Sequence, residues 1–117
     1  MAATVLIVDD HGPFRSYARA LLAAEGFDVV GEAGDGASAI EAAVRLRPDV
    51  ILLDVQLPDA DGFAVAERLA ETAAPPRVVL ISTREASVFR RRLEGAPAVG
   101  FIAKDDLSGE ALAALLA

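Results

Sequence analysis

Five short apolar segments alternate along the chain with stretches in which apolar residues recur every three or four positions. The segments lie at residues 5–8, 27–33, 50–53, 78–81 and 100–103. An uninterrupted apolar run is typical of a strand buried on both faces, and the three-to-four spacing is typical of a helix with one apolar face. Their strict alternation predicts an α/β fold in which helices cover both faces of a parallel sheet. The 117 residues fit one domain, over residues 1–117.

The composition excludes several functional classes. The chain has no cysteine and one histidine, which excludes disulfide frameworks, thiolate zinc sites, cysteine nucleophiles and histidine-rich metal sites. A net charge of −7 disfavours binding of nucleic acids or anionic membranes by this domain itself. No apolar stretch approaches the ~20 residues of a membrane span, and the N-terminus lacks the basic region of a secretory signal. We therefore expect a soluble, cytoplasmic protein with no membrane partner.

Polar side chains follow the predicted strands at the points where the strands end. Asp9 and Asp10 follow the first segment, Asp54 the third, Ser82 the fourth and Lys104 the fifth. The carboxyl ends of parallel strands form the edge of an open sheet at which ligands bind. If the first and third strands are neighbours, the three carboxylates share one crevice with the hydroxyl and the ammonium group. No glycine-rich phosphate loop follows the first segment, which disfavours nucleotide binding.

These side chains together indicate phosphoryl chemistry. Three carboxylates in one crevice repel each other, and a divalent cation relieves the repulsion. An all-oxygen donor set favours Mg²⁺ or Mn²⁺ over Zn²⁺. A carboxylate, a metal ion, a hydroxyl and an ammonium group are the parts needed to move a phosphoryl group onto Asp54 by in-line attack. The cation and Lys104 would then neutralise charge on the phosphoryl oxygens.

Each residue also has a structural interpretation. An aspartate after a strand is commonly a helix N-cap, and Asp10 would cap a helix that begins near residue 13. Lys104 alone would be a solvated lysine, and His11 is expected to be a partly exposed loop residue rather than a metal ligand. The arginines at 90–92 fit a solvated helix face better than a docking surface. The occurrence of the acidic, hydroxyl and ammonium groups at four strand ends favours the functional interpretation.

Four stretches of the chain resemble the receiver domain of bacterial response regulators in two-component signalling. They are residues 5–11, 49–62, 79–82 and 100–104. The resemblance implies a flavodoxin-like (βα)5 doubly wound parallel sheet with strand order 2-1-3-4-5. It also implies that a sensor histidine kinase phosphorylates the domain, and that helix 4, strand 5 and helix 5 form the surface that controls output or dimerisation.

The resemblance assigns roles position by position. Asp54 is expected to be the phosphoacceptor, and Mg²⁺ (or Mn²⁺) is expected to be held by carboxylates and one backbone carbonyl: Asp9, Asp10, Asp54 and Gln56. Lys104 would pair with the phosphoryl group and Ser82 would hydrogen-bond one of its oxygens. Phe101 would be the aromatic switch residue that turns inward with Ser82. Such a domain catalyses only its own phosphorylation and dephosphorylation and turns over no separate substrate. Gln56 and Arg84 are expected to flank the phosphoryl site and to tune its hydrolysis.

Three further stretches resemble the NarL/FixJ branch, whose members usually carry a C-terminal helix-turn-helix DNA-binding domain. They are residues 9–11, 29–33 and 104–107. We therefore expect either a single-domain receiver or the receiver part of a longer regulator, which would contact DNA only through a domain outside this chain. A phosphorylation-dependent homodimer is also implied. The segment 95–101, which leads to the aromatic residue Phe101, is longer than the corresponding segment of most receiver domains. This predicts a short or displaced helix 4.

Two other functions remain as alternatives. One is a metal-dependent phosphatase or phosphotransferase of the haloacid-dehalogenase kind, which also uses an aspartate nucleophile after a strand. Such enzymes need a second aspartate two positions later, where this chain has Gln56. The other is a receiver-like interaction module that is never phosphorylated. Loss of an acidic residue or of the lysine would favour it, but Asp9, Asp10 and Lys104 are all present.

Overall fold

The strands form one parallel sheet with the order β2-β1-β3-β4-β5, in a computed structural model that describes residues 2–117. The strands are β1 (Thr4–Val8), β2 (Asp28–Ala33), β3 (Val50–Asp54), β4 (Arg77–Ser82) and β5 (Gly100–Ala103). All neighbouring pairs are parallel. The predicted flavodoxin-like fold and its strand order are confirmed.

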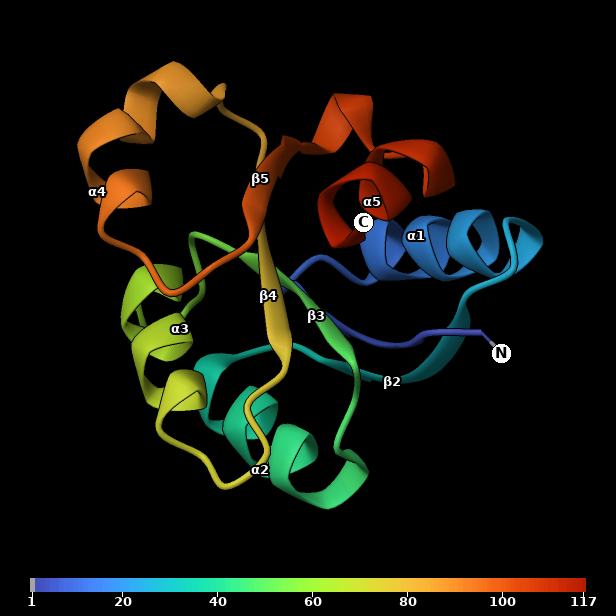
Figure 1. Ribbon diagram of the computed structural model, residues 1–117, viewed down its shortest axis with the longest axis horizontal. Coiled ribbons are helices and arrows are strands. Elements are labelled where there is room, and N and C mark those ends of the chain that lie inside the picture. The colour runs from blue at the N-terminus through green and yellow to red at the C-terminus, as the bar shows by residue number, and fades with distance from the viewer. Residues whose placement is uncertain (1) are drawn as a thin grey trace.

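Helices cover both faces of the sheet, as Figure 1 shows. They are α1 (Gly12–Ala24), α2 (Gly36–Leu46), α3 (Gly62–Ala70), α4 (Arg90–Glu94) and α5 (Gly109–Leu116), with short 3₁₀ turns η1 (Ala86–Phe89) and η2 (Lys104–Asp106). Helices α1 and α5 pack on one face, and α2 and α3 pack on the other together with the region of α4 (Figure 1). Successive side chains of one strand therefore enter two different cores, which is why the strands are continuously apolar.

Strand β1 illustrates the two cores. Val5 and Ile7 face the core beneath α1 and α5, whereas Leu6 and Val8 face the core beneath α2 and α3, and all four are fully buried. Strand β3 is buried along its whole length. Its last residue is an aspartate at the edge of both cores, so the packing of the strand holds that side chain in place.

Several element boundaries differ by a residue from those predicted. Strand β2 begins at Asp28 rather than 27, because the N–H of Phe27 donates to the carbonyl of Leu22 and belongs to the end of α1. Strands β1 and β4 extend outward to Thr4 and to Arg77 and Ser82, polar residues that an apolar pattern does not include. Helix α1 ends at Ala24, and Gly26, two residues later, adopts a positive φ of 92°.

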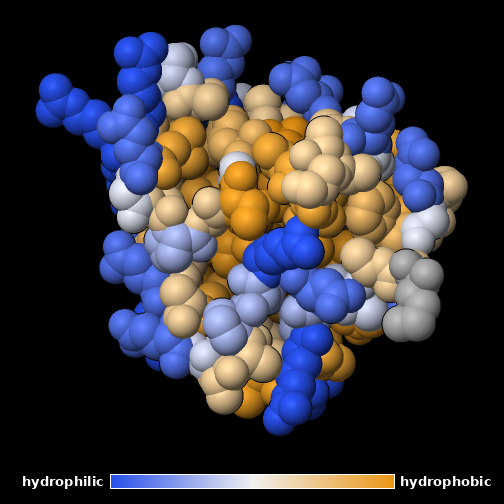
Figure 2. Space-filling model, in the orientation of Figure 1, coloured by the Kyte–Doolittle hydropathy of each residue, from blue (hydrophilic) through white to orange (hydrophobic). Residues whose placement is uncertain are grey.

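Helix α4 is short, as the sequence predicts. Residues 86–89 form a 3₁₀ turn and only Arg90–Glu94 are α-helical. Of residues 86–94, all within the described chain, none is buried. Figure 2 shows long hydrophilic side chains projecting at the upper left, where Figure 1 places α4, with more apolar surface toward the centre of this face.

Candidate functional site

The strand order brings the predicted polar residues to one edge of the sheet. Asp9 follows β1, Asp54 ends β3, Ser82 ends β4 and Lys104 follows β5. Because β1, β3, β4 and β5 are consecutive neighbours, these four residues lie side by side at the carboxyl edge. A cleft of about 270 Å³ opens there and is lined by acidic, polar and basic side chains: Asp10, Asp54, Gln56, Ser82, Thr83 and Lys104.

Lys104 joins two buried carboxylates at the base of this cleft. Its Nζ donates to Asp54 Oδ2 at 3.0 Å and forms an ion pair with Asp9 Oδ2. Asp9 is fully buried and Asp54 is 5% exposed. A single ammonium group balances only one of the two anions, and the half-exposed carboxylate of Asp10 adds a third negative charge at the rim. The cleft therefore keeps an excess of negative charge.

The protonation states follow from burial and from these contacts. Burial raises the pKa of the Asp54 carboxyl above its ordinary value, although the Gln56 N–H and the Lys104 ammonium act in the opposite direction. Burial lowers the pKa of Lys104, but Asp9 and Asp54 outweigh it and raise this pKa above the ordinary lysine value. Lys104 is therefore charged at neutral pH. Asp54 is a more basic carboxylate than an exposed aspartate.

The loop after β1 holds its acidic residues by backbone contacts. Asp9 Oδ1 accepts a hydrogen bond from the His11 N–H at 2.8 Å, and the carbonyl of Asp9 accepts one from Arg15 Nη1 at 2.6 Å. Helix α1 begins at Gly12 with His11 at its N-cap, so the interpretation of Asp10 as the cap is wrong. The side chain of His11 is 74% exposed, as expected for a loop residue.

The donor set of the cleft fits a hard divalent cation. One carboxylate oxygen from each of Asp9 and Asp10, and one ring nitrogen of His11, lie within 4.8 Å of one another. The buried Asp9 Oδ2 contacts the Lys104 ammonium and, among residues 2–117, no further donor. A buried carboxylate oxygen without a full set of donors, beside two further carboxylates, is a suitable ligand for Mg²⁺.

Residues 55–61 form the loop between β3 and α3. The Gln56 N–H donates to Asp54 Oδ1 at 3.0 Å, and the side chain of Gln56 is exposed. Asp59 accepts hydrogen bonds from the N–H groups of Gly36 and Ala37 at the start of α2. The loop is therefore fixed both to the phosphoacceptor candidate and to a neighbouring helix.

The two predicted switch residues lie on either side of η1. Ser82 Oγ accepts a hydrogen bond from the Arg84 N–H at 3.0 Å, so its hydroxyl is directed toward its own loop. Phe101 is half-buried on β5 and lines a cavity of about 430 Å³ with residues of η1 and α5. Its ring is 6.0 Å from that of Phe89, which also lines a separate cavity next to Ser82.

Two functional contacts lie outside the sequence prediction. Arg15 and Arg19 of α1 both pair with Glu32 of β2, which fixes α1 beside the acidic loop. Arg92 of α4 pairs with Asp61, the N-cap of α3. Residues 90–92 are exposed, as the solvated interpretation predicts, but Arg92 also has a partner. Asp61 before Gly62 is a recognisable N-cap signal, but no sequence signal indicates its arginine partner.

Comparison with known proteins gives one consistent family. The sequence model of the response regulator receiver domain matches residues 5–116. The chain is 41% identical over 115 residues to the Probable transcriptional regulatory protein NarL of Mycobacterium tuberculosis, which covers 96% of this chain and 52% of that protein. It is 36% identical over 102 residues to the virulence-factor transcription regulator BvgA of Bordetella pertussis, covering 87% and 49%. The chain thus spans about half the length of these curated relatives.

Solved structures agree with the sequence comparison. The signal receiver domain of NarL from Mycobacterium tuberculosis superposes with a TM-score of 0.83 at 39% identity, covering 98% of this chain and 94% of that one. The response regulator domain of CheB from Thermotoga maritima has a TM-score of 0.84 at 29% identity, covering 99% and 95%. Within residues 2–117, no helix is both long and apolar enough to cross a membrane.

Proposed function

Because the chain belongs to the response regulator receiver domains of two-component systems, we propose that it accepts a phosphoryl group on Asp54 from a sensor histidine kinase in the cytoplasm. The observation that carries the proposal is the contact of Lys104 with both Asp9 and Asp54 at the base of a cleft that also contains Ser82. A nucleophilic carboxylate, an ammonium group and a hydroxyl thus face the same small volume.

Receiver domains bind Mg²⁺ at an acidic pocket, and the donor set of this cleft fits that ion. We assign Asp9, Asp10, Asp54 and the backbone carbonyl of Gln56 as the groups that would hold Mg²⁺, or Mn²⁺ in its place. The bound cation supplies neutralisation of negative charge on the phosphoryl oxygens.

In the proposed transfer, a carboxylate oxygen of Asp54 attacks the phosphorus of a phosphohistidine. A phosphorus–oxygen bond forms, the phosphorus–nitrogen bond breaks, and the histidine nitrogen leaves with the bonding pair. Lys104 remains charged and compensates the phosphoryl oxygens, while Ser82 turns from the Arg84 N–H to donate its hydroxyl hydrogen to one of them. Water later hydrolyses the acyl phosphate, returning the carboxylate and releasing inorganic phosphate. The domain acts as a signalling element and turns over no separate substrate.

We propose that this change is transmitted to the surface formed by α4, β5 and α5. The inward turn of Phe101 would alter that surface and control output or the formation of a homodimer. Residues 1–117 form the receiver unit in this proposal. Since the relatives NarL and BvgA are transcription regulators about twice as long as the matched part, DNA would be contacted through a region outside these residues.

The test is an amide NMR titration with Mg²⁺ and beryllofluoride, a phosphoryl mimic, followed by acetyl phosphate. We expect shifts at Asp54, Ser82 and Phe101 in the wild type and none in Asp54→Asn. Asp59→Asn is the matched control, because it removes a carboxylate of the same loop whose contacts are with α2 rather than the cleft. It should respond like the wild type. An unresponsive wild type would indicate an interaction module instead, and turnover of a phosphate monoester would indicate a phosphatase.

A further inference from the structure

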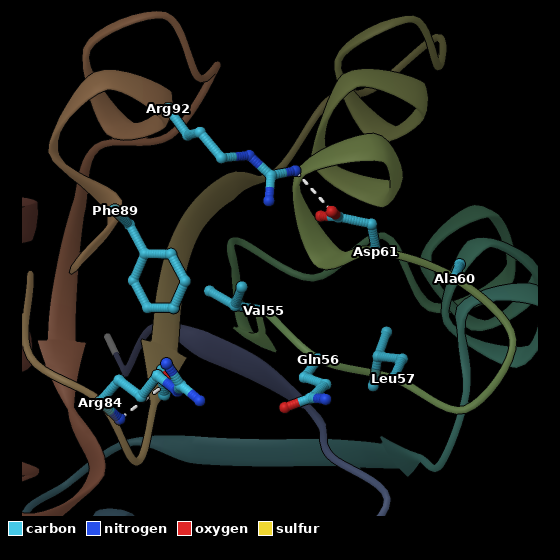
Figure 3. Close-up of a pocket in the computed structure, with 9 residues that line it drawn as sticks. Val55, Gln56, Leu57, Ala60, Asp61, Arg84, Phe89 and Arg92 are labelled. Carbon is cyan, nitrogen blue, oxygen red and sulfur yellow. Dashed lines mark hydrogen bonds and ion pairs between the residues drawn. The ribbon is translucent and has the colours of Figure 1, made fainter.

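Arg92 joins helix α4 to the start of helix α3. Its Nη2 donates to Asp61 Oδ2 at 2.5 Å (Figure 3). Its Cζ lies 4.2 Å from the centre of the Phe63 ring. Asp61 Oδ1 at the same time accepts the N–H of Phe63 as the N-cap of α3. One carboxylate thus holds both the first turn of α3 and the side chain from α4. We call this set of contacts of Arg92 with Asp61 and Phe63 the α4 latch.

The start of α3 is also in direct contact with the phosphoacceptor backbone. The Gly62 N–H donates to the carbonyl of Val55 at 2.6 Å, and a Cβ at Gly62 would lie only 2.2 Å from the carbonyl oxygen of Asp54. A movement of residues 54 and 55 must therefore move Gly62, and with it the neighbouring Asp61. This contact links Asp54 to the α4 latch without using Ser82 or Phe101.

The α4 latch borders a cavity that is also lined by Ser82, one of the two expected switch residues. This cavity, of about 430 Å³, lies between the β3–α3 loop and α4, with Arg92, Asp61 and Phe89 in its wall and Ser82 at its margin (Figure 3). The Phe89 ring lies 5.9 Å from Phe63 and 6.0 Å from Phe101, so it stands between the two. The Phe89 ring is thus a direct neighbour of Phe101 and also lines this cavity, and Phe89 immediately precedes the helix that Arg92 holds.

We propose that the α4 latch holds the domain in its resting conformation and opposes binding of a phosphoryl group at Asp54. The proposal rests on the proposed function and adds a second link between the site and α4. The contacts are compatible with a resting state, because Ser82 bonds to its own loop and Lys104 still pairs with Asp54. By linkage, removing a contact that exists only in the resting conformation must raise the affinity for a ligand that selects the activated one.

The size of the effect follows from the exposure of the pair. The side chains of Arg92 and Asp61 are 51% and 43% exposed. An ion pair or a cation–π contact at such an exposed position changes an equilibrium constant by only a small factor. We expect loss of the latch to tighten beryllofluoride binding about threefold to tenfold.

The experiment measures beryllofluoride affinity at saturating Mg²⁺ for the wild type, Arg92→Ala, Asp61→Asn and the double variant. Asn retains the N-capping oxygen of residue 61 but not its charge. The two single substitutions change the net charge in opposite directions, so a shared increase in affinity cannot arise from simple attraction of the anion. The double variant should gain no more than Arg92→Ala alone, because that substitution already removes both the ion pair with Asp61 and the cation–π contact with Phe63.

Arg91→Ala is the matched control for the loss of one arginine from α4. In the described chain no ion pair or aromatic contact involves Arg91, so its affinity should equal that of the wild type. A wild type that responds to beryllofluoride, with either Arg92→Ala or Asp61→Asn unchanged or weaker, overturns the latch alone. A wild type that shows no response overturns the proposed function and the latch together.

Discussion

The two sides of the cleft differ in how many of their residues are buried in the core. On one side, Asp54 ends a strand that is buried along its whole length, and α3 behind it has five buried residues. On the other side, Ser82 leads into residues 86–94, all described and none of them buried. The chemical groups are therefore held by two cores, whereas the expected switching segment rests on the surface through a few side chains.

This difference separates the requirements of chemistry from those of signalling. Phosphoryl transfer needs an acceptor and a counter-charge fixed within a fraction of an ångström. A switch needs an element whose two positions differ by only a few kcal/mol, and such elements come from the least stable parts of a fold. Arg92 belongs to the side without buried residues but pairs with Asp61 on the buried side.

Matched leucine truncations in α3 and α4 test this comparison most strongly. Leu69 is fully buried in α3, whereas Leu93 in α4 is only partly buried. We expect Leu69→Ala to lower the free energy of unfolding by about 3 kcal/mol and Leu93→Ala by about 1 kcal/mol, measured by urea denaturation. Equal losses would show that α4 is as firmly packed as α3 and would remove the basis of the comparison.

Matched glycine substitutions probe the contact between α3 and the phosphoacceptor backbone. A methyl group at Gly62 would overlap the backbone of Asp54 and Val55, whereas one at Gly95, at the end of α4, meets no atom within 4 Å. We expect Gly62→Ala to lower the free energy of unfolding by about 2 kcal/mol and to weaken beryllofluoride binding. Gly95→Ala should change stability by no more than about 0.5 kcal/mol. A neutral Gly62→Ala would contradict the tight coupling of α3 to Asp54.

The same division explains which features the sequence could predict. A strand buried on both faces appears in the sequence as an uninterrupted apolar run, so all five strands were predictable from the residues alone. Because the strands are parallel, their carboxyl ends bring Asp9, Asp54, Ser82 and Lys104 to one edge of the sheet. The strand order itself followed only from the resemblance to a known family. Strand ends were less predictable, because polar residues such as Thr4 and Arg77 continue the hydrogen-bonded ladder without an apolar side chain.

The switching side was predictable only in outline. The sequence indicates a short α4, but it does not indicate that Phe89 stands between Phe63 and Phe101 or that Arg92 reaches Asp61. These contacts depend on the path of residues 83–99, where the apolar residues Val88, Phe89 and Leu93 indicate a helix but not which partners its side chains meet. Three consecutive arginines look alike in a sequence, and only the fold distinguishes the one that has a partner.

The final prediction concerns the effect of the buried, ionised Asp54 side chain on the free energy of unfolding. Burial raises the pKa of Asp54, so its ionised form destabilises the folded state: the stability present at low pH is lost as the pH rises through the raised pKa. We expect Asp54→Asn to raise the free energy of unfolding at pH 7, and the gain to disappear as the pH falls through that pKa. Urea denaturation across a pH series measures both.

Asp59→Asn is the control, because it should change the free energy of unfolding in the opposite direction. Hydrogen bonds from the Gly36 and Ala37 N–H groups lower the pKa of the Asp59 carboxyl, so its stabilising effect is present above the ordinary aspartate pKa and is lost as the pH falls through the lowered one. This variant should therefore be less stable than the wild type at neutral pH, with a difference that shrinks in acid. If Asp54→Asn also loses stability at pH 7, the pair with Lys104 outweighs the burial of Asp54, and the cleft is stabilising rather than strained. The buried side of the cleft would then hold its charged groups without cost to the fold.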